Sequence, residues 1–248
     1  MEARQYDELK RVQETHWWFK GKREIVTDFL DRYSKKGGNL LDVGCGMGLM
    51  LDVLDNYGDS YGMDMEPVAV EYCRSRLTPN QSFRIQQGYF PDNIPFEDNY
   101  FDTIIALDVL EHIEDDEGSM CKIRDLLTTD GVLIATVPAL MSMWSYNDVL
   151  NHHYRRYEFE ELKDKIIRSG FKIEKISFYN SKLFVIAYAV RKLKNALHIE
   201  SSDVKENNGN MRDSFINKIL YKIFVSEKNH LRKRDYKKGV SIILVARK

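Results

Sequence analysis

The stretch that decides the fold is residues 40–48, which read Leu40-Leu41-Asp42-Val43-Gly44-Cys45-Gly46-Met47-Gly48. An apolar strand runs into a glycine-rich turn here, and glycines at such a turn let backbone N–H groups approach a ligand, as in doubly wound α/β nucleotide sites. The acid at position 42, just ahead of the glycines, is the informative departure. A carboxylate there repels the phosphates of a dinucleotide and attracts a ligand that carries an ammonium group.

The spacing of the glycines separates two kinds of nucleoside ligand. A nicotinamide fingerprint needs a third glycine where this chain has Leu49, so Gly48 comes one residue too early. Asp64, about 20 residues downstream at the end of the second predicted strand, suits the ribose hydroxyls of either ligand. S-adenosylmethionine (SAM) is a nucleoside that carries an ammonium group and is therefore the favoured cofactor. The alternative is a glycine-rich turn that binds no ligand.

Further phrases downstream extend the pattern. They read Gly88-Tyr89-Phe90-Pro91, Ile94-Pro95-Phe96, Phe101-Asp102-Thr103-Ile104-Ile105-Ala106-Leu107-Asp108-Val109-Leu110-Glu111-His112 and Gly131-Val132-Leu133-Ile134-Ala135-Thr136-Val137-Pro138. With these phrases the chain closely resembles the class I SAM-dependent methyltransferases over nearly all of its length. The resemblance implies an α/β, Rossmann-like fold, in which a seven-stranded, mainly parallel sheet has an antiparallel last strand and helices on both faces.

The resemblance also implies which residues bind SAM. In the family the glycine loop holds the methionine end, the second acid holds the ribose, the loop after the third strand meets the adenine, and the end of the fourth strand faces the methyl group. The matching positions are Asp42, Gly44, Gly46, Gly48, Asp64, Met65, Gly88, Tyr89, Phe90, Leu107 and Asp108. Tyr89 departs from the pattern, because many relatives carry there an Asp that binds the adenine amino group. Adenine contacts through the backbone and through stacking are therefore expected.

Composition bounds the remaining possibilities. A length of 248 residues and a hydrophobic content of 43% fit a single methyltransferase domain over residues 1–248. The net charge of −1, and the lack of an Asn-Pro-Pro-Tyr type phrase after the fourth strand, argue against a nucleic-acid substrate. Three scattered cysteines are too few for a disulfide framework or a zinc site, so we predict no metal.

The expected location follows from apolar segments. No apolar signal segment opens the chain, and the longest apolar run, residues 183–190, is too short to cross a bilayer. We therefore expect a cytoplasmic protein, which could also lie against the inner face of the membrane.

The predicted elements alternate as in a mainly parallel sheet. Strands are expected near residues 39–43, 60–64, 82–86, 101–107 and 131–137. A helix from about Glu158 to Ser169 and a strand from Phe171 to Tyr179 follow. The last apolar run, residues 240–246, is the expected antiparallel strand, so residues 180–238 form a helical insertion in the terminal hairpin. Within it, the stretch from Glu200 to Asn210 is expected to be the least ordered.

A loop rich in His, Tyr and Arg follows the fifth predicted strand. A hydroxyl acceptor must lose a proton as it attacks the methyl group, and His153 is suited to take it. Arg155 and Arg156 could hold a phosphate or carboxylate of the acceptor, with Trp144 and Tyr157 in the same loop. Methyltransferases of bacterial glycan-assembly gene clusters show a similar His-x-Arg-Arg-Tyr phrase. The alternative is a structural loop whose arginines pair with acidic side chains, namely Asp148, Glu158 and Glu160.

A second group of polar residues stands at the end of the fourth predicted strand. Asp108 is expected to face the methyl group and to orient the acceptor, and His112 is a second candidate base. Glu111 and His112 are expected to begin the next helix, and an equally strong alternative is that they only cap and brace it.

The opening segment, residues 1–36, is predicted to be helical and carries Trp17 and Trp18. Aromatic residues at this density most often pack in a core. The functional alternative is a lid over the SAM pocket that shapes the acceptor site, in which both tryptophans contact the acceptor.

The insertion is basic within an otherwise acidic chain. Residues 191–238 hold thirteen Lys and Arg against six Asp and Glu, beside apolar helical faces. Basic amphipathic helices suit an anionic membrane surface or a lipid-phosphate substrate. The alternative is a helical cover over the sheet or a dimer face, so both a monomer and a dimer are open.

The sequence therefore predicts a SAM-dependent methyltransferase that acts on a small or lipid-linked acceptor. O-methylation of a glycan, glycolipid or quinone-like compound is favoured, because a loop with candidate bases is present and the phrase Leu110-Glu111-His112-Ile113 resembles quinone O-methyltransferases. The alternatives are an N-methyltransferase of an amino sugar or other small amine, and a catalytically silent SAM-binding scaffold.

Overall fold

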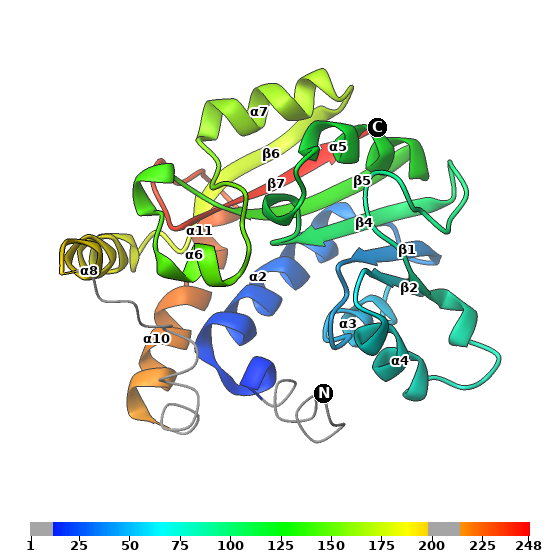
Figure 1. The fold of residues 1–248 in the computed structure, drawn as a ribbon, viewed down its shortest axis with the longest axis horizontal. Helices are drawn as coiled ribbons and strands as arrows, with labels where there is room; N and C mark the ends of the chain where they lie inside the picture. Colours follow the sequence, from blue (N-terminus) through cyan, green and yellow to red (C-terminus); the bar gives the residue numbers. More distant parts are fainter. Residues whose placement is uncertain (1–11, 198–213) are drawn as a thin grey trace.

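A computed structural model describes residues 12–197 and 214–248 as a twisted sheet with helices on both faces (Figure 1). The stretch from Glu200 to Asn210 lies outside the described residues. The sheet has seven strands in the order β3-β2-β1-β4-β5-β7-β6. The strands are β1 (Gly38–Val43), β2 (Gly58–Asp64), β3 (Ile85–Gln87), β4 (Phe101–Leu107), β5 (Leu127–Pro138), β6 (Lys172–Tyr179) and β7 (Ser241–Arg247).

Strand direction confirms the predicted Rossmann-like sheet. Strands β1 to β5 pair in parallel, and β7 runs antiparallel to both β5 and β6. Since helices cover both faces, the central strands are apolar at consecutive positions instead of alternating. In β7, for example, Ser241 to Ala246 are all buried.

Two helical layers enclose the sheet. One face is covered by α2 (Trp17–Tyr33), α3 (Leu51–Leu54), α10 (Phe215–Val225) and α11 (Lys228–Leu231). The opposite face is covered by α5 (Asp116–Leu126) and α7 (Phe159–Arg168). Helix α4 (Pro67–Ser75) packs beside β2 and β3. Because β1, β2 and β4 are parallel, their carboxyl ends lie together at one edge of the sheet, between the two helical layers.

Helix α2 is an integral part of this domain. The side chain of His16 caps the helix by accepting a hydrogen bond from the backbone N–H of Trp18. The helix buries a continuous stripe against the sheet, made of Ile25, Val26, Phe29 and Leu30. The lid role of residues 1–36 stays a prediction, and residues 1–11 lie outside the described part of the chain.

The insertion between β6 and β7 contributes helices in its described part. These are α8 (Phe184–Ala196), α10 and α11, and no side chain of α8 is fully buried. Figure 1 shows α8 at the outer end of the molecule and α10 alongside α2. The insertion leaves the sheet at Tyr179 and returns at Ser241, two residues that pair with each other.

Two local predictions are wrong. The third strand is expected near residues 82–86 but begins at Ile85, because Ser82–Arg84 form a 3-10 turn instead of strand. Glu111 and His112 do not begin the next helix. They lie in a separate 3-10 turn, Leu110–His112, and α5 starts at Asp116 with Asp115 as its cap.

Candidate active site

The glycine loop has the backbone geometry that the sequence predicts. Gly44, Gly46 and Gly48 all have φ between +51° and +74°, which side chains disfavour. At Gly44 a Cβ atom would lie 2.7 Å from Cγ2 of Val109, so the turn also packs closely on the segment after β4. At Gly46 a Cβ atom would meet nothing within 4 Å, so the backbone there faces open space. A ligand can therefore approach the backbone at Gly46.

Asp64 is positioned by the same loop. Its carboxylate accepts hydrogen bonds from the backbone N–H of Gly46 at 2.8 Å and of Glu66 at 2.9 Å. Each carboxylate oxygen retains a lone pair, because a carboxylate offers about four acceptor positions. Asp64 can therefore still accept from two ribose hydroxyls.

Asp42 is a buried acid without a compensating contact. It is 4% exposed, and among the described residues no hydrogen bond reaches its carboxylate. Burial, and secondarily the charge of Asp64, raise the pKa of Asp42 to about 8. A ligand ammonium group next to this carboxylate would supply the missing positive charge. These residues therefore fit the methionine end of SAM.

The remaining predicted cofactor residues lie at the ends of β2, β3 and β4. Met65 and Tyr89 expose 63% and 52% of their surface, so both are available to cover a nucleoside. Gly88 is tightly enclosed, since a Cβ atom there would lie 2.6 Å from the carbonyl oxygen of Asn93. Phe90 is buried in the core, so only its backbone remains for a ligand, and Leu107 is half-buried at the end of β4.

Asp108 stands where β4 ends and is held from two sides. Its carboxylate accepts from Lys22 Nζ at 2.9 Å and from Thr136 Oγ1 at 2.7 Å. The backbone at Asp108 has φ of 58°, an uncommon value for a residue other than glycine. Burial opposes ionisation of Asp108, but the charge of Lys22 and the hydrogen bonds from Lys22 and Thr136 together outweigh burial and lower the pKa of Asp108. A carboxylate is therefore maintained at the strand end.

Lys22 is a site residue that sequence reasoning missed. It lies on the same helical stripe as Ile25, Val26 and Phe29, which pack on the sheet. A lysine on such a stripe needs an anion at the sheet surface, and its partner here is Asp108. This periodic position is the signal that could have found it.

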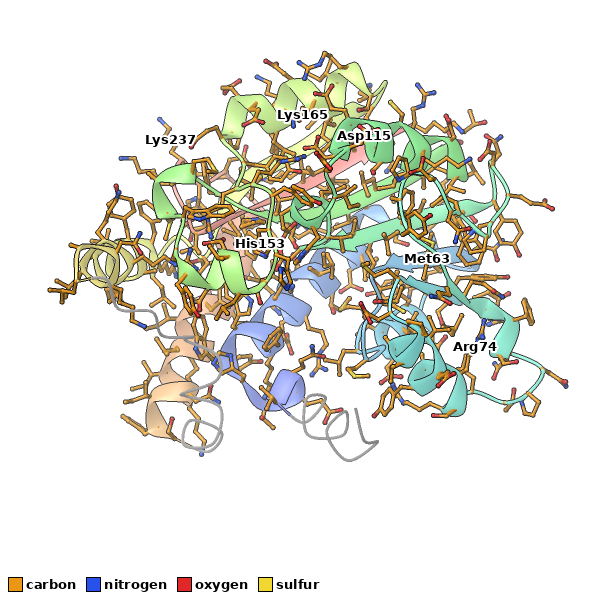
Figure 2. All side chains as sticks on the ribbon, viewed as in Figure 1. Met63, Arg74, Asp115, His153, Lys165 and Lys237 are labelled. Atoms are coloured by element: carbon orange, nitrogen blue, oxygen red, sulfur yellow. The ribbon has the colours of Figure 1, made fainter. Side chains whose placement is uncertain are left out.

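The two candidate histidines lie face to edge at the same strand end. The ring centroids of His112 and His153 are 4.6 Å apart at 89°, although the residues come from different loops. Figure 2 shows His153 close to where β4 ends. The charge of His153 contributes to the lowered pKa of Asp108. The structure thus brings together the three residues that the sequence proposes for catalysis.

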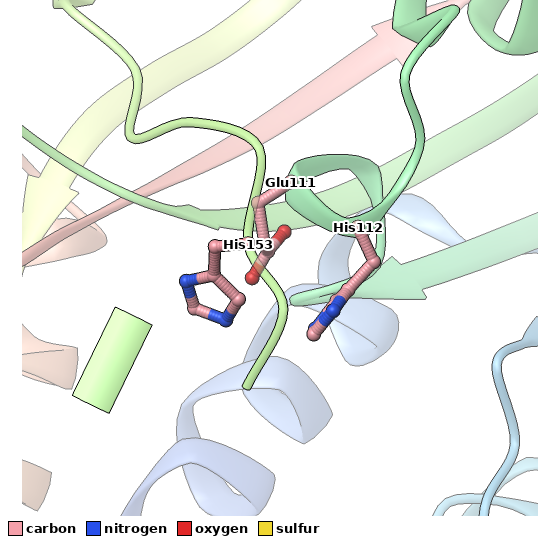
Figure 3. A group of neighbouring side chains, drawn as sticks. All are labelled: Glu111, His112 and His153. Atoms are coloured by element: carbon pink, nitrogen blue, oxygen red, sulfur yellow. The ribbon is translucent and has the colours of Figure 1, made fainter. Parts of the chain in front are cut away.

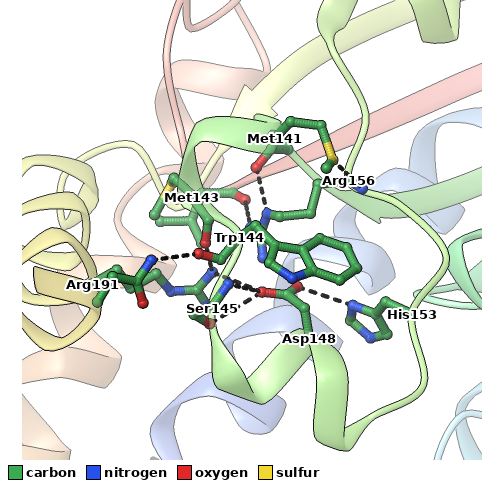
Figure 4. A network of polar contacts seen from close by, with 11 residues as sticks. Met141, Met143, Trp144, Ser145, Asp148, His153, Arg156 and Arg191 are labelled. Atoms are coloured by element: carbon green, nitrogen blue, oxygen red, sulfur yellow. Dashed lines mark hydrogen bonds and ion pairs between the residues drawn. The ribbon is translucent and has the colours of Figure 1, made fainter. Parts of the chain in front are cut away.

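A buried carboxylate orients His153. Asp148 Oδ1 lies 3.0 Å from Nδ1 of His153 and accepts from Nη1 of Arg156 at 2.8 Å (Figure 4). Asp148 Oδ2 accepts from the backbone N–H of Ser145, which closes a capping box on α6 (Tyr146–Leu150). The hydrogen bond from His153 and the charge of Arg156 outweigh burial and hold the pKa of Asp148 well below its usual range.

The predicted acceptor-binding role of Arg156 and Tyr157 is wrong. Arg156 is 3% exposed and donates to the carbonyl oxygens of Ala139 and Val240 as well as to Asp148. Tyr157 is fully buried, and its hydroxyl donates to Asp116 at 2.8 Å. Arg155 also pairs with Asp116, at 2.9 Å. The pairing of an arginine with Asp148, the structural alternative for this loop, is confirmed, whereas Glu160 pairs with Lys163.

The tryptophans also have packing partners. Trp18 stacks on Phe224 with centroids 5.1 Å apart, and Trp17 meets the same ring edge-on at 5.7 Å. Both therefore join α2 to α10, as the core alternative predicts. Trp144 lies beside Asp148 in Figure 4, and its carbonyl oxygen accepts from Asn195 of α8. Among the predicted acceptor residues, Trp144 thus lies in the part of the loop that holds Asp148 and His153.

Glu111 is the least expected member of the site. It is 1% exposed, and neither carboxylate oxygen has a hydrogen-bond partner among the described residues. Burial, and then the charge of Asp108, raise the pKa of Glu111 well above its ordinary value. The sequence gives no sign of this burial, because a glutamate in a short turn is exposed in most proteins.

Comparisons with known proteins agree with this geometry. Residues 41–135 match a family model described as a methyltransferase domain. The chain is 23% identical over 223 residues to uncharacterized protein MJ1252 of Methanocaldococcus jannaschii, covering 89% of this chain and 84% of the relative. It is 25% identical over 166 residues to a probable S-adenosylmethionine-dependent methyltransferase of Mycolicibacterium smegmatis, covering 66% of this chain and 62% of the relative.

The fold has a counterpart among solved structures. A SAM-dependent methyltransferase from Archaeoglobus fulgidus superposes with a TM-score of 0.54 at 16% identity, over 91% of this chain and 94% of the other. At that identity the likeness concerns the fold. The stretch that matches the methyltransferase family model includes the glycine loop, Asp64 and Asp108.

Proposed function

The chain is a class I SAM-dependent methyltransferase, and from that premise we propose that it methylates a hydroxyl oxygen of a small or lipid-linked acceptor. A glycan, a glycolipid or a quinone-like compound would offer such a hydroxyl. In the reaction a C–O bond forms as the C–S bond of the sulfonium breaks, the electron pair stays on sulfur, and the hydroxyl proton must leave. The chain needs groups that place the hydroxyl and assist loss of its proton.

The observation that carries the proposal is the Asp148–His153 pair beside Asp108. With Nδ1 of His153 at 3.0 Å from Asp148, the other ring nitrogen is left for the acceptor side. A hydrogen-bonded carboxylate sets the tautomer of a histidine and raises its basicity. His153 and His112 can therefore assist removal of the proton next to the end of β4, the strand end that we expect to face the methyl group.

An N-methyltransferase of an amino sugar or other small amine is the second candidate. Asp108 supports it, because this carboxylate already binds an ammonium group, that of Lys22, at 2.9 Å. An amine acceptor could take the same place. A catalytically silent scaffold is less consistent with the site, since Trp17 and Trp18 have their packing partner in Phe224.

The test is transfer of labelled methyl from SAM. We expect label to enter a compound in lipid or aqueous extracts of the source cells, and mass spectrometry of the product locates the methyl on oxygen or nitrogen. Calorimetry with SAM serves as the parallel binding assay. Binding without transfer to any extract would favour the scaffold, and transfer to nitrogen would favour the amine.

A membrane surface is the partner that we propose for the insertion. The described part of the chain contains no helix that could span a membrane. Helix α8 nevertheless exposes Val185, Ile186 and Leu193 by 60% or more beside basic residues such as Lys192. It is tied to the acceptor loop, because Asn195 donates to Trp144 and Arg191 donates to Met143. A cytoplasmic protein could thereby meet a lipid-linked acceptor at the inner face of the membrane.

Vesicle co-sedimentation tests this partner. Binding to vesicles rich in phosphatidylglycerol should be strong at low salt and weaken as salt rises, because the attraction decays within about 8 Å at physiological ionic strength. The variant Ile186→Ser should bind less. The matched control is Ile167→Ser, an exposed apolar residue on α7. Equal absence of binding at both salt concentrations would leave α8 as a protein-facing surface.

A further inference from the structure

The side chains of Glu111, His112 and His153 form a cluster of potential metal ligands. Their ligand atoms all lie within 4.8 Å of one another, and they are the one group of this kind in the described residues. Figure 3 shows the Glu111 carboxylate and a nitrogen of each ring turned toward a common space. We propose that these three side chains bind a divalent transition-metal ion beside Asp108. The proposal rests on the proposed function only for the role of the ion.

The state of Glu111 is the first support. A carboxyl group that is 1% exposed, with both oxygens unpartnered among the described residues, is costly to bury. Lys22 and Arg156 affect the Glu111 carboxyl group only at a distance. The ammonium group of Lys22 hydrogen-bonds to Asp108, and the guanidinium group of Arg156 hydrogen-bonds to Asp148. A cation coordinated by the two histidines would give this carboxylate its missing partner.

The orientation of both histidines is the second support. Nδ1 of His153 is hydrogen-bonded to Asp148, and the side chain of His112 is hydrogen-bonded to the backbone of Asn151. Each ring therefore has one nitrogen fixed from outside and one left for a ligand. Metal-binding histidines almost always have such an outer partner, which fixes the tautomer and increases the basicity of the binding nitrogen.

The donor set indicates the kind of ion. Two imidazoles and one carboxylate suit zinc, iron, cobalt or manganese better than magnesium, which prefers oxygen ligands. Three protein ligands also leave coordination positions open. The sequence missed this site because His153 is far from His112 along the chain and the scattered cysteines argued against a metal.

An ion here would act on the acceptor. A hydroxyl that coordinates a divalent cation has a lowered pKa, so its proton can pass to water before the oxygen attacks the methyl carbon. The C–O bond then forms, the C–S bond breaks, and its electron pair stays on sulfur. His112 and His153 would serve as ligands in this reaction, and Asp148 as the residue that positions His153.

Calorimetric titration of untagged, chelator-treated protein with Zn²⁺ and separately with Mn²⁺ tests the proposal. We expect one ion per chain. The variants Glu111→Gln, His112→Ala and His153→Ala should each bind the ion at least about tenfold more weakly, because the loss even of a group that only supports a ligand costs about tenfold or more. The matched control is His152→Asn, which removes a neighbouring exposed imidazole at a backbone position with φ of 56° that Asn tolerates.

A second readout guards against misfolding. Co²⁺ bound to the wild type should give visible absorption bands that change in each of the three variants and stay unchanged in His152→Asn, while circular dichroism reports the fold. Binding of neither Zn²⁺ nor Mn²⁺ below about 100 µM, or equal binding by folded variants, would overturn the inference. If the wild-type protein binds the metal ion but does not bind SAM, the result would instead count against the proposed function.

Discussion

Replacing Asp148 by alanine should be among the most destabilising single changes in this chain. The side chains of Asp148 and Arg156 are 2% and 3% exposed, and they pair at 2.8 Å. In Asp148→Ala the guanidinium of Arg156 keeps the carbonyl oxygens of Ala139 and Val240 but loses the one carboxylate that it pairs with among the described residues. Breaking a buried pair by removing one partner costs about 3 to 5 kcal/mol, because the remaining charge is buried and unpaired.

The assay is thermal and urea unfolding followed by circular dichroism. For a domain of this size about 3 to 5 kcal/mol lowers Tm by roughly 6 to 20 °C. The matched control is Glu160→Ala, which breaks an exposed pair with Lys163 and should cost below about 1 kcal/mol. The double variant Asp148→Ala/Arg156→Met removes both charges and should be more stable than Asp148→Ala alone. If Asp148→Ala unfolds within about 1 kcal/mol of Glu160→Ala, the reasoning about this buried pair is refuted.

Three further predictions concern the cofactor and the chemistry. Asp64→Ala should weaken SAM binding by about 1.5 to 3 kcal/mol in calorimetry, the scale of losing hydrogen bonds to a charged group, and unchanged affinity would exclude ribose binding by Asp64. Because the pKa of Asp42 is raised to about 8, free protein at pH 7 holds a proton that an ammonium ligand displaces. SAM binding should therefore release about one proton at pH 7 and strengthen from pH 6 to 8, as calorimetry in buffers of different ionisation enthalpy would show, and Asp42→Asn should abolish the release. His153→Ala should lower turnover by about 10² to 10⁴ while SAM affinity stays near wild type, and joint loss of both would indicate a structural loop.

The features that the sequence predicts well are those set by neighbours along the chain. Hydrophobic periodicity and turn residues are local properties of the sequence. They therefore predict the glycine turn after β1, the acid that ends β2 and the apolar run of β7. The start of β3 is misplaced because a 3-10 turn and a strand edge differ little in sequence.

The features that the sequence could not predict depend on contacts between distant segments. Arg156 looks like a solvent-facing loop residue, and only the approach of Val240 from the end of the chain shows that its guanidinium is enclosed. The burial of Glu111 likewise depends on the loop that brings His153 beside it. Charged residues of this kind are exposed in most proteins, so local composition favours the wrong environment for both.

The shared aromatic packing of α2 and α10 has a consequence for exchanging parts between relatives. Residues 180–238 leave and re-enter the sheet at the paired residues Tyr179 and Ser241, so a transplanted insertion need not alter strand register. Phe224 is nevertheless fully buried, and its ring packs on Trp17 and Trp18 from the other end of the chain. A chimera that receives a foreign insertion but keeps its own first helix would leave these rings unmatched. A chimera should therefore fold stably only when both segments come from the same parent.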